Sequence, residues 1–233
     1  MSSNRLASGG GYKAVFFDLD GTLVDTAPDM VAILTRMQDE RRQPHLPYNT
    51  ARNSVSNGAL GLLRLGFPEA SHDDLQALLA EYLDQYRTAV CVNSEVFAPL
   101  RDLLQIFTEN RRPWGIVTNK PTRMTDPLLS QLDLAQDAAC VICGDTLAER
   151  KPHPAPLLHA AQLAGVDPED SLYVGDASRD IEAGRAAGMA TIAVGYGYIN
   201  EDDDPIDWGA DEYVTDTMSL MALLLRALDL EPQ

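Results

Sequence analysis

One short stretch constrains this chain more than any other, because an apolar run stops abruptly at a pair of aspartates. Residues 14–17 read Ala-Val-Phe-Phe, a pattern typical of a strand that helices cover on both faces of a parallel sheet. Asp18 and Asp20 follow, and Gly21 allows a sharp turn after them. Residues i and i+2 of extended chain point the same way. The sequence therefore predicts two carboxylates that converge at the carboxyl end of a buried strand.

Paired carboxylates in such a place need a counter-charge, since burial disfavours their charged form. Oxygen ligands favour a hard cation, and a few carboxylates together with waters and a substrate phosphate suit Mg²⁺. Beside that ion the Asp18 carboxylate can attack phosphorus, while Asp20 can protonate the leaving oxygen and later activate water. These residues alone leave one alternative open, a strand-to-helix turn in which an aspartate serves only as a cap.

The chain after residue 99 alternates between short apolar strands and amphipathic helices. Further strands are expected at residues 114–117, 139–142, 172–174, 190–194 and 212–215. Strands that alternate with helices form right-handed βαβ units, so we predict an α/β fold with a Rossmann-like parallel sheet. Functional side chains of such sheets lie beyond the carboxyl ends of the strands.

Residues 26–95 differ from the rest, because they show helical periodicity and no candidate strand. We expect one helix at residues 29–41, a second that is capped by Asn49 and continues through Leu63, and a third that begins after Ser71. The segment is therefore predicted to be a helical insert.

Length and composition set the domain organisation. A chain of 233 residues that is 45% hydrophobic can bury a core and carry a smaller inserted domain. We predict a core formed by residues 12–25 and 96–233, with residues 26–95 inserted between them. Residues 1–11 are Ser/Gly-rich and lack the apolar segment of a signal peptide, so they are expected to form a flexible tail.

Charge and hydropathy exclude several classes of partner. A formal net charge of −17 argues against nucleic acid and anionic membrane surfaces, and the sequence has no apolar run long enough to span a bilayer. We expect a cytoplasmic protein, a monomer or weak homodimer, whose partner is a small-molecule phosphate ester. Since that ester is itself anionic, the site must be locally positive.

Polar residues at two further positions suit phosphate chemistry. Thr118 and Asn119 directly follow the strand expected at residues 114–117, where a hydroxyl and an amide can hydrogen-bond phosphoryl oxygens. Lys151 precedes a proline, which holds its backbone extended. Its ammonium can lower the repulsion between the Asp18 carboxylate and an incoming phosphate. A turn-forming Thr-Asn pair and a solvated surface lysine are the structural alternatives.

Two more aspartates follow the strand expected at residues 172–174. Asp176 is placed to complete a metal site, and Asp180 comes one helical turn later. We expect Asp180 to orient Lys151 or to hold a metal-bound water, and a helix-capping role for it is compatible with either.

Together these motifs resemble the haloacid dehalogenase-like (HAD) phosphatase superfamily. Residues 18–26 read D-L-D-G-T-L-V-D-T and match its first motif, D-x-D-G-T-L-x-D-[ST], at every position. Thr118, Lys151-Pro152 and the segment 175–180 (G-D-A-S-R-D) resemble its second, third and fourth motifs, in the same order and with similar spacing. The resemblance covers nearly the whole chain. It implies a HAD core, with residues 26–95 as an α-helical cap that closes over the site.

The resemblance also implies roles for individual residues. Asp18 would be the nucleophile and Asp20 the general acid and base, and the second aspartate argues against dehalogenation. Mg²⁺ would be held by the Asp18 carboxylate, the Asp20 main-chain carbonyl and Asp176. The remaining residues would act on the phosphate or behind it: Thr118 and Lys151 as catalytic phosphate-binding groups, Asn119 as an additional donor, and Asp180 behind the metal and Lys151.

Residues 52–59 (R-N-S-V-S-N-G-A) resemble the cap loop of the phosphoglycolate phosphatase branch. Arg52, Asn57 and Gly58 are accordingly expected to contact the substrate, and Arg52 would meet an anionic group. Residues 114–121 and 196–211 are similar to enzymes of this branch that act on N-acetylmuramic acid 6-phosphate. The resemblance thus implies that sugar acid phosphate or 2-phosphoglycolate as substrate.

Two other functions stay open at this point. A phosphomutase of the same fold would act on a sugar phosphate without releasing inorganic phosphate, and a non-catalytic binding protein would use the same core. The C-x-x-C of Cys140 and Cys143 also invites a redox function. However, residues i and i+3 of a strand face opposite sides, so we expect two buried, inert thiols.

Overall fold

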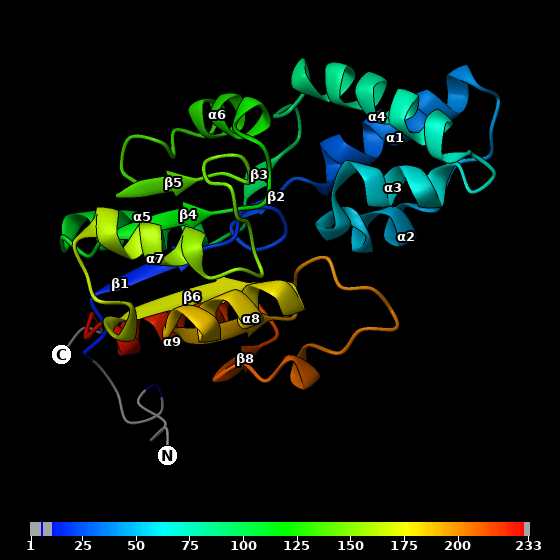
Figure 1. Cartoon of the computed structure of the whole chain (residues 1–233). Helices are drawn as coiled ribbons and strands as arrows, with labels where there is room; N and C mark the ends of the chain where they lie inside the picture. The colour runs from blue at the N-terminus through cyan, green and yellow to red at the C-terminus, as the bar shows by residue number, and fades with distance from the viewer. Residues whose placement is uncertain (1–5, 7–10, 231–233) are drawn as a thin grey trace.

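The protein is built from an α/β core and a group of helices beside it (Figure 1). The computed structural model describes residue 6 and residues 11–230. The expected tail, residues 1–11, lies outside the described residues except for Leu6, which is buried, and Gly11, whose backbone N–H donates to Asp229 Oδ2. Within the described part of the chain, no helix combines the length and the apolar character needed to cross a membrane.

A parallel, six-stranded sheet forms the centre of the core. Its strands in chain order are β1 (Ala14–Phe17), β4 (Trp114–Val117), β5 (Cys140–Ile142), β6 (Ser171–Gly175), β7 (Ala190–Val194) and β8 (Glu212–Val214). Their spatial order is β5-β4-β1-β6-β7-β8, and every pair is parallel. The predicted α/β fold is therefore confirmed, and the strands differ from their expected bounds by one residue at most.

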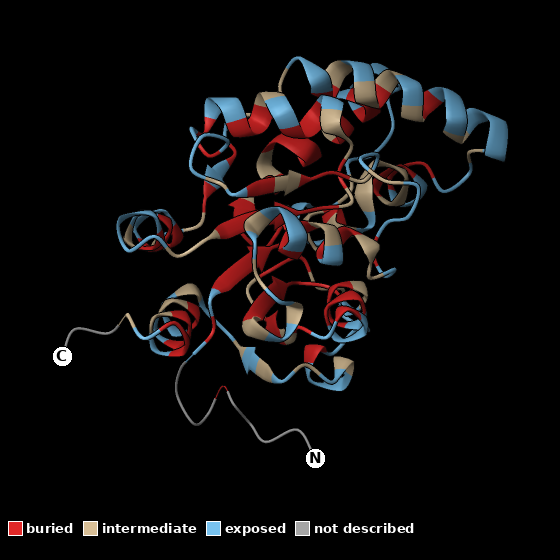
Figure 2. Ribbon diagram, turned by 60° about the vertical axis from the view of Figure 1, so that its left-hand side comes forward, coloured by how far each residue is buried: buried red, intermediate tan, exposed pale blue. Residues whose placement is uncertain are grey.

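Strand β1 lies in the interior of the sheet because its side chains are apolar on both faces. Ala14 and Phe16 belong to one buried cluster, while Val15 and Phe17 belong to the other. Figure 2 shows this burial as a continuous red band through the sheet, with exposed residues on the outer sides of the helices. Burial of apolar surface stabilises the fold by about 25 cal/mol per Å². Because both faces of β1 are buried, this free energy fixes the register of the strand that leads into the Asp18–Asp20 turn.

The core helices cover both faces of the sheet. They are α5 (Leu100–Glu109), α6 (Thr122–Gln131), α7 (Ala155–Ala164), α8 (Ser178–Ala187) and α9 (Thr217–Ala227), and short 3₁₀ turns occur at Pro168–Asp170 and Pro205–Trp208. Helices α7 and α8 pack side by side on one face, and α5 packs with α9 on the other (Figure 1). The loops at the carboxyl ends of the strands remain uncovered by these helices, and this is the edge that the predicted site residues occupy.

The inserted helices lie between two short strands, β2 (Val24–Asp25) and β3 (Glu95–Val96), which pair antiparallel. The helices are α1 (Ala27–Glu40), α2 (Tyr48–Asn53), α3 (Gly58–Gly66) and α4 (His72–Arg87), with a 3₁₀ turn at Val55–Asn57. We call this helical unit the cap. Figure 1 shows it to one side of the sheet, beyond the loops that follow the strands.

One expected cap helix is interrupted. The helix predicted to run from Asn49 through Leu63 is in fact α2, the 3₁₀ turn and α3, and α2 begins after Pro47. The break has a backbone cause, because Gly58 has φ +72° and ψ −177°, a conformation that cannot continue a helix and that glycine tolerates. The third helix begins as expected, with Ser71 in a capping box with Asp74.

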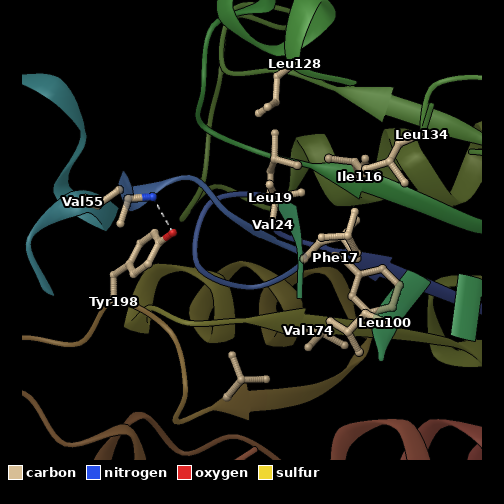
Figure 3. Close-up of a cluster of buried hydrophobic side chains, with 14 of the residues drawn as sticks. Phe17, Leu19, Val24, Val55, Leu100, Ile116, Leu128, Leu134, Val174 and Tyr198 are labelled. Carbon is tan, nitrogen blue, oxygen red and sulfur yellow. Dashed lines mark hydrogen bonds between the residues drawn. The ribbon is translucent and has the colours of Figure 1, made fainter. Parts of the chain in front are cut away.

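The chain passes between core and cap at two places, which we call the crossings, and a set of hydrogen bonds holds each of them. The buried Asp29 carboxylate of α1 accepts from the backbone N–H groups of residues 92–94 and from the Ser94 hydroxyl, next to β3. At the other crossing, the Tyr198 hydroxyl accepts from the backbone N–H groups of Thr26 and Ala27 and donates to Asp25 Oδ1. Figure 3 shows the Tyr198 hydroxyl directed at a backbone nitrogen beside the apolar core.

The two cysteines of the C-x-x-C are buried, unreactive thiols. Cys140 begins β5 and Cys143 follows it, and both are free and buried. Burial raises the pKa of the Cys140 thiol to about 12, and burial is also the main cause of the raised pKa of Cys143. Neither thiol is therefore a ready nucleophile, as the sequence predicts.

Candidate active site

The site begins where three adjacent strands end. Strands β4, β1 and β6 are neighbours in the sheet, and Thr118, Asp18 and Asp176 are the residues that directly follow them. All three are buried. Since the carboxyl ends of parallel strands meet at one edge, residues far apart in the chain converge here, as expected for an open α/β sheet.

Lys151 occupies the centre of this edge and is buried within the core. Its Nζ lies 2.9 Å from Asp18 Oδ1 and 2.7 Å from Asp180 Oδ1, and it donates to the Tyr173 hydroxyl at 2.7 Å. Tyr173 in turn donates to the Val117 carbonyl at 2.8 Å. The lysine is thus held from several sides by groups of the core alone. It is not the solvated surface lysine that the sequence left open.

Asp180 combines the two roles that the sequence left compatible. One carboxylate oxygen pairs with Lys151, while the other accepts from the Ala177 backbone N–H at 3.1 Å and so closes the first turn of α8. This bond satisfies the backbone N–H of the N-cap residue. The start of α8 and Lys151 are therefore tied to the same carboxylate.

Three buried carboxylates, those of Asp18, Asp176 and Asp180, offer oxygen atoms within 4.8 Å of one another. Burial first, and then the carboxylates of Asp18 and Asp180, raise the pKa of Asp176 to about 7. A site this crowded with negative charge favours a cation. Gly21 belongs to the same cradle, because a side chain at this position, where φ is +80°, would collide with the Asp176 carboxylate. The residues present thus fit a hard metal ion.

Thr118 and Asn119 behave differently from each other. Thr118 is buried, lines the cavity described below, and accepts from the Lys120 backbone N–H at 3.2 Å. The Asn119 side chain instead spans the backbone of Lys151, donating to its carbonyl at 2.9 Å and accepting from its N–H at 3.1 Å. Asn119 also lines the cavity, but its amide group is engaged in fixing the lysine-bearing loop.

Asp20 lies on the cap side of the turn and is partly exposed. Its Oδ1 accepts from the Thr26 hydroxyl at 2.7 Å and from Lys120 Nζ at 2.9 Å. Lys120 is buried, and its Nζ also donates to the Tyr86 hydroxyl of α4 at 3.0 Å. Burial alone would lower the pKa of Lys120, but the Asp20 carboxylate and Tyr86 raise it overall, so the lysine is charged.

The cap touches the acidic centre directly. The Ser56 hydroxyl donates to Asp176 Oδ2 at 2.8 Å, and the Ser56 carbonyl accepts from Arg179 Nη2 at 2.8 Å. The Tyr198 backbone N–H donates to the same Asp176 oxygen at 2.8 Å. In this structure the cap is therefore seated on the core.

A cavity of about 460 Å³ lies between cap and core, directly over the site. Its floor contains Asp18, Asp20, Thr118 and Lys151. Its wall on the cap side is largely apolar, and its members include Met30, Val55, Ala59, Tyr82, Leu83 and Tyr86. Asn57 and Gly58, which the sequence places at the substrate, also line the cavity. The volume is in the range of small-molecule sites.

The position of Arg52 needs correction. Its guanidinium donates to the carbonyls of Tyr196 and Gly197 at 3.1 and 3.0 Å, and it lies 4.9 Å above the Tyr198 ring. The residues that line the cavity do not include it. Carbonyl oxygens and an aromatic face already satisfy this cation, so the geometry makes Arg52 a contact between cap and core instead of a ligand for an anionic substrate group.

Sequence reasoning missed Lys120, Tyr86 and Tyr173. A signal for Lys120 was present, because it precedes Pro121 just as Lys151 precedes Pro152, and the same restriction of the backbone applies to both. The tyrosines carried no such signal. Tyr86 lies on the apolar stripe of its helix, and Tyr173 lies within a buried strand, so each reads as a core residue.

Comparison with known proteins agrees with this geometry. The sequence profile of the haloacid dehalogenase-like hydrolases matches residues 12–188. The protein belongs to this family. The predicted membership of the HAD superfamily is therefore confirmed, and so is its assignment among the phosphatases of that superfamily.

Two relatives carry different names. The chain is 42% identical over 219 residues to the N-acetylmuramic acid 6-phosphate phosphatase of Pseudomonas putida, and the match covers 93% of this chain and 97% of the relative. It is 44% identical over 202 residues to the phosphoglycolate phosphatase of Xanthomonas campestris, covering 87% of this chain and 91% of the relative.

A solved structure shares the whole HAD architecture. The crystal structure titled "predicted phosphoglycolate phosphatase" from Haemophilus somnus has a TM-score of 0.80 and 26% sequence identity, and the match covers 91% of this chain and 98% of that one. Both the sheet core and the inserted helices are therefore part of a known HAD fold.

Proposed function

We propose that this HAD hydrolase releases inorganic phosphate from N-acetylmuramic acid 6-phosphate through a phosphorylated Asp18. The observation that carries the choice of substrate is the cavity of about 460 Å³, with a polar floor and an apolar cap-side wall. The relative named for this activity is similar over nearly its full length.

The first half of the reaction follows from the residues on the cavity floor. The Asp18 carboxylate attacks phosphorus, the bond from phosphorus to the ester oxygen breaks, and that oxygen takes the proton of the Asp20 carboxyl group. Lys151 lies 2.9 Å from Asp18, so its charge offsets the repulsion between the carboxylate and the phosphate. Thr118 lines the same cavity, and its hydroxyl would donate to a phosphoryl oxygen.

The second half regenerates the enzyme. Water gives a proton to Asp20 and attacks phosphorus, the bond from phosphorus to Asp18 breaks, and phosphate leaves. The carboxylates of Asp18 and Asp176 and the main-chain carbonyl of Asp20 would hold Mg²⁺, and Asp180 would act through Lys151 or a bound water. When bound, the ion supplies positive charge that stabilises the negative charge developing on the transferred phosphoryl group.

Cavity size favours the sugar over 2-phosphoglycolate. Phosphoglycolate is a small anion of charge −2 to −3 with a single methylene group, and it would leave most of the cap-side wall in contact with water. The sugar acid has acetyl and lactyl methyl groups that can pack against Val55, Ala59 and Leu83, while Arg150 and Arg179 line the same cavity and can face its carboxylate. Burying such apolar groups contributes about 0.8 kcal/mol per methylene-sized unit.

A phosphate-release assay with both esters tests the proposal in the presence of Mg²⁺. We expect kcat/KM for N-acetylmuramic acid 6-phosphate to exceed that for 2-phosphoglycolate by about tenfold or more, since roughly 1.4 kcal/mol of differential binding suffices. The reverse order would reject the substrate and leave the chemistry intact. Conversion of a sugar phosphate without phosphate release would instead identify a phosphomutase.

Replacement of the nucleophile tests the covalent route. Asp18→Asn should abolish turnover of both esters, and an unchanged circular dichroism spectrum would show that the variant folds. Trapping phosphate on the wild-type chain, but not on Asp18→Asn, would support the intermediate. Residual turnover by Asp18→Asn near the wild-type rate would rule it out.

A further inference from the structure

Asp20 is held directly by Thr26 and Lys120, and Lys120 is held in turn by Tyr86. Thr26 lies at the first crossing to the cap, Lys120 lies in the core loop after β4, and Tyr86 lies in cap helix α4. The Thr26 hydroxyl and Lys120 Nζ both contact Asp20 Oδ1, at 2.7 and 2.9 Å. Lys120 Nζ also lies 3.3 Å from Asp20 Oδ2. The general acid is therefore oriented from outside its own turn.

Lys120 is positioned too deeply to act as an ordinary surface cation. Its side chain is only 5% exposed, and its Nζ lies 4.8 Å from the centre of the Tyr86 ring and 4.0 Å from Met30 Sδ. The hydrogen bond to the Tyr86 hydroxyl at 3.0 Å completes its surroundings. The backbone before Pro121 restricts the lysine further.

The cap supplies much of this environment. Met30 and Tyr86 belong to cap helices α1 and α4, while Lys120 belongs to the core. Tyr86 is nearly fully buried, and burial is the largest cause of the shift that raises the pKa of its hydroxyl to about 12, so the hydroxyl stays neutral and available to accept from the lysine. The Lys120 ammonium thus joins the general acid to a cap helix.

We propose that Lys120, held by Tyr86, is the positioning residue that aims the Asp20 carboxyl group at the leaving oxygen when the cap is seated on the core. The proposal rests on the phosphatase function proposed above. Lys120 transfers no proton itself. It fixes the direction of the group that does, and the link through Tyr86 makes that direction depend on the cap.

This role predicts a selective kinetic defect. A sugar alkoxide is a poor leaving group that needs a proton as the ester bond breaks, whereas p-nitrophenolate leaves without one. A misdirected Asp20 therefore harms hydrolysis of the sugar ester more than that of p-nitrophenyl phosphate. The measurement is kcat/KM for both esters, since this quantity reports the steps up to departure of the leaving group.

The variants are Lys120→Met and Tyr86→Phe, with Lys13→Met as the matched control. Lys13 pairs with Asp170 on the surface, at a side-chain exposure of 57%. We expect Lys120→Met to lower kcat/KM for N-acetylmuramic acid 6-phosphate by about 100-fold, within the range for general acid catalysis, and to lower that for p-nitrophenyl phosphate less than tenfold. Tyr86→Phe should give a selective loss of about fivefold, and Lys13→Met none.

Other outcomes reject either this proposal or the phosphatase function on which it rests. Equal losses on the two esters in Lys120→Met would mean that the lysine binds phosphate or only supports the fold. If Lys120→Met does not fold, the test rests on Tyr86→Phe, through the ratio of its kcat/KM values for the two esters. An unchanged ratio in Tyr86→Phe rejects the link to the cap, whether or not Lys120→Met folds. A wild-type protein that hydrolyses neither ester would instead reject the proposed function itself, before Lys120 is tested.

Discussion

The site contains two buried lysines in similar surroundings, and only one of them depends on the cap. Lys151 and Lys120 each precede a proline, pair with an aspartate of the first motif at 2.9 Å, and donate to a tyrosine hydroxyl. Each also lies near a tyrosine ring, at 5.4 Å from Tyr173 and 4.8 Å from Tyr86. Tyr173 belongs to a core strand, whereas Tyr86 belongs to a cap helix.

This difference divides the chemistry between the two parts of the molecule. The half around Lys151 contains Asp18, the proposed nucleophile, and its lysine is held by groups of the core alone. The half around Lys120 contains Asp20, the proposed proton donor, and its lysine contacts both the core and the cap. Under the proposed mechanism, the nucleophile would be preorganised in the core, and the general acid would be aligned only when the cap is seated, which would protect the reaction from water.

The largest expected effect is that of Lys151→Met. The substitution leaves the carboxylates of Asp18, Asp176 and Asp180 buried together without the cation at 2.7 and 2.9 Å. Breaking a buried ion pair typically costs about 3–5 kcal/mol, so urea unfolding should show a loss of that size together with loss of turnover. Lys120→Met should lose less stability, because Asp20 is 17% exposed and keeps the Thr26 hydroxyl. Equal losses would show that the two halves do not differ as described.

The half of the site around Lys151, which we call the core half, could be predicted almost fully from the sequence. The apolar runs at residues 14–17 and 114–117 stop at polar residues, and the observed strands β1 and β4 have these same bounds. Parallel pairing then brings the strand ends together. The contact between Lys151 and Asp18 follows from the topology and the family motifs, and the structure shows it at 2.9 Å.

The half around Lys120, which we call the cap half, could not be predicted in the same way, for physical reasons. The bond from Lys120 to Tyr86 depends on how a helix of the insert docks on the core, and helical periodicity does not encode docking. Gly58 breaks the expected second helix through a backbone conformation that the apolar spacing does not reveal. The resemblance places Arg52 in a substrate-binding loop, whereas its contacts with residues 196–198 depend on tertiary packing.

Metal binding should stabilise the core half. Because Asp18 and Asp176 would hold Mg²⁺ only when folded, a concentration of about 100 times the dissociation constant should add about 2.7 kcal/mol to the free energy of unfolding. Asp176→Asn should reduce this gain, whereas Asp202→Asn, at an exposed position, should retain it. The gain is measured by urea unfolding with and without Mg²⁺. An identical gain in Asp176→Asn would place the ion elsewhere.

Asp29→Asn should weaken the crossing next to β3, where the Asp29 carboxylate accepts from residues 92–94. Burial raises the pKa of Asp29, but hydrogen bonds from Ser94, Asn93 and Val92 lower it overall. A carboxyl group with a lowered folded pKa contributes stability above its unfolded pKa of about 3.9, and that contribution is lost as pH falls through the folded value.

We therefore expect Asp29→Asn to cost about 1.5–3 kcal/mol at neutral pH, the range for hydrogen bonds to charged groups. The difference from wild type should shrink below about pH 4. Urea unfolding across this pH range measures both. Asp39→Asn, at an exposed position near the end of the same helix, serves as the control. A difference that persists unchanged in acid would mean that the carboxylate charge is not what holds the crossing.

The smallest expected effects come from the paired substitutions Tyr173→Phe and Tyr86→Phe, which remove one hydroxyl from each half. The Tyr173 hydroxyl accepts from Lys151 and donates to the Val117 carbonyl, so its loss should cost about 1–2 kcal/mol of global stability. The Tyr86 hydroxyl accepts from Lys120 across the boundary between cap and core, and its loss should cost about 0.5–1 kcal/mol.

The two variants should differ more in hydrogen exchange than in unfolding. Local opening of a docked unit exposes its amides without unfolding the core. Tyr86→Phe should therefore speed amide exchange in α4 and in the loop after β4 while leaving β1 and β6 protected, whereas Tyr173→Phe should affect β6 itself. Uniform acceleration in both variants would show that cap and core open as one unit, and the division of the site into a fixed half and a cap-dependent half would then fail.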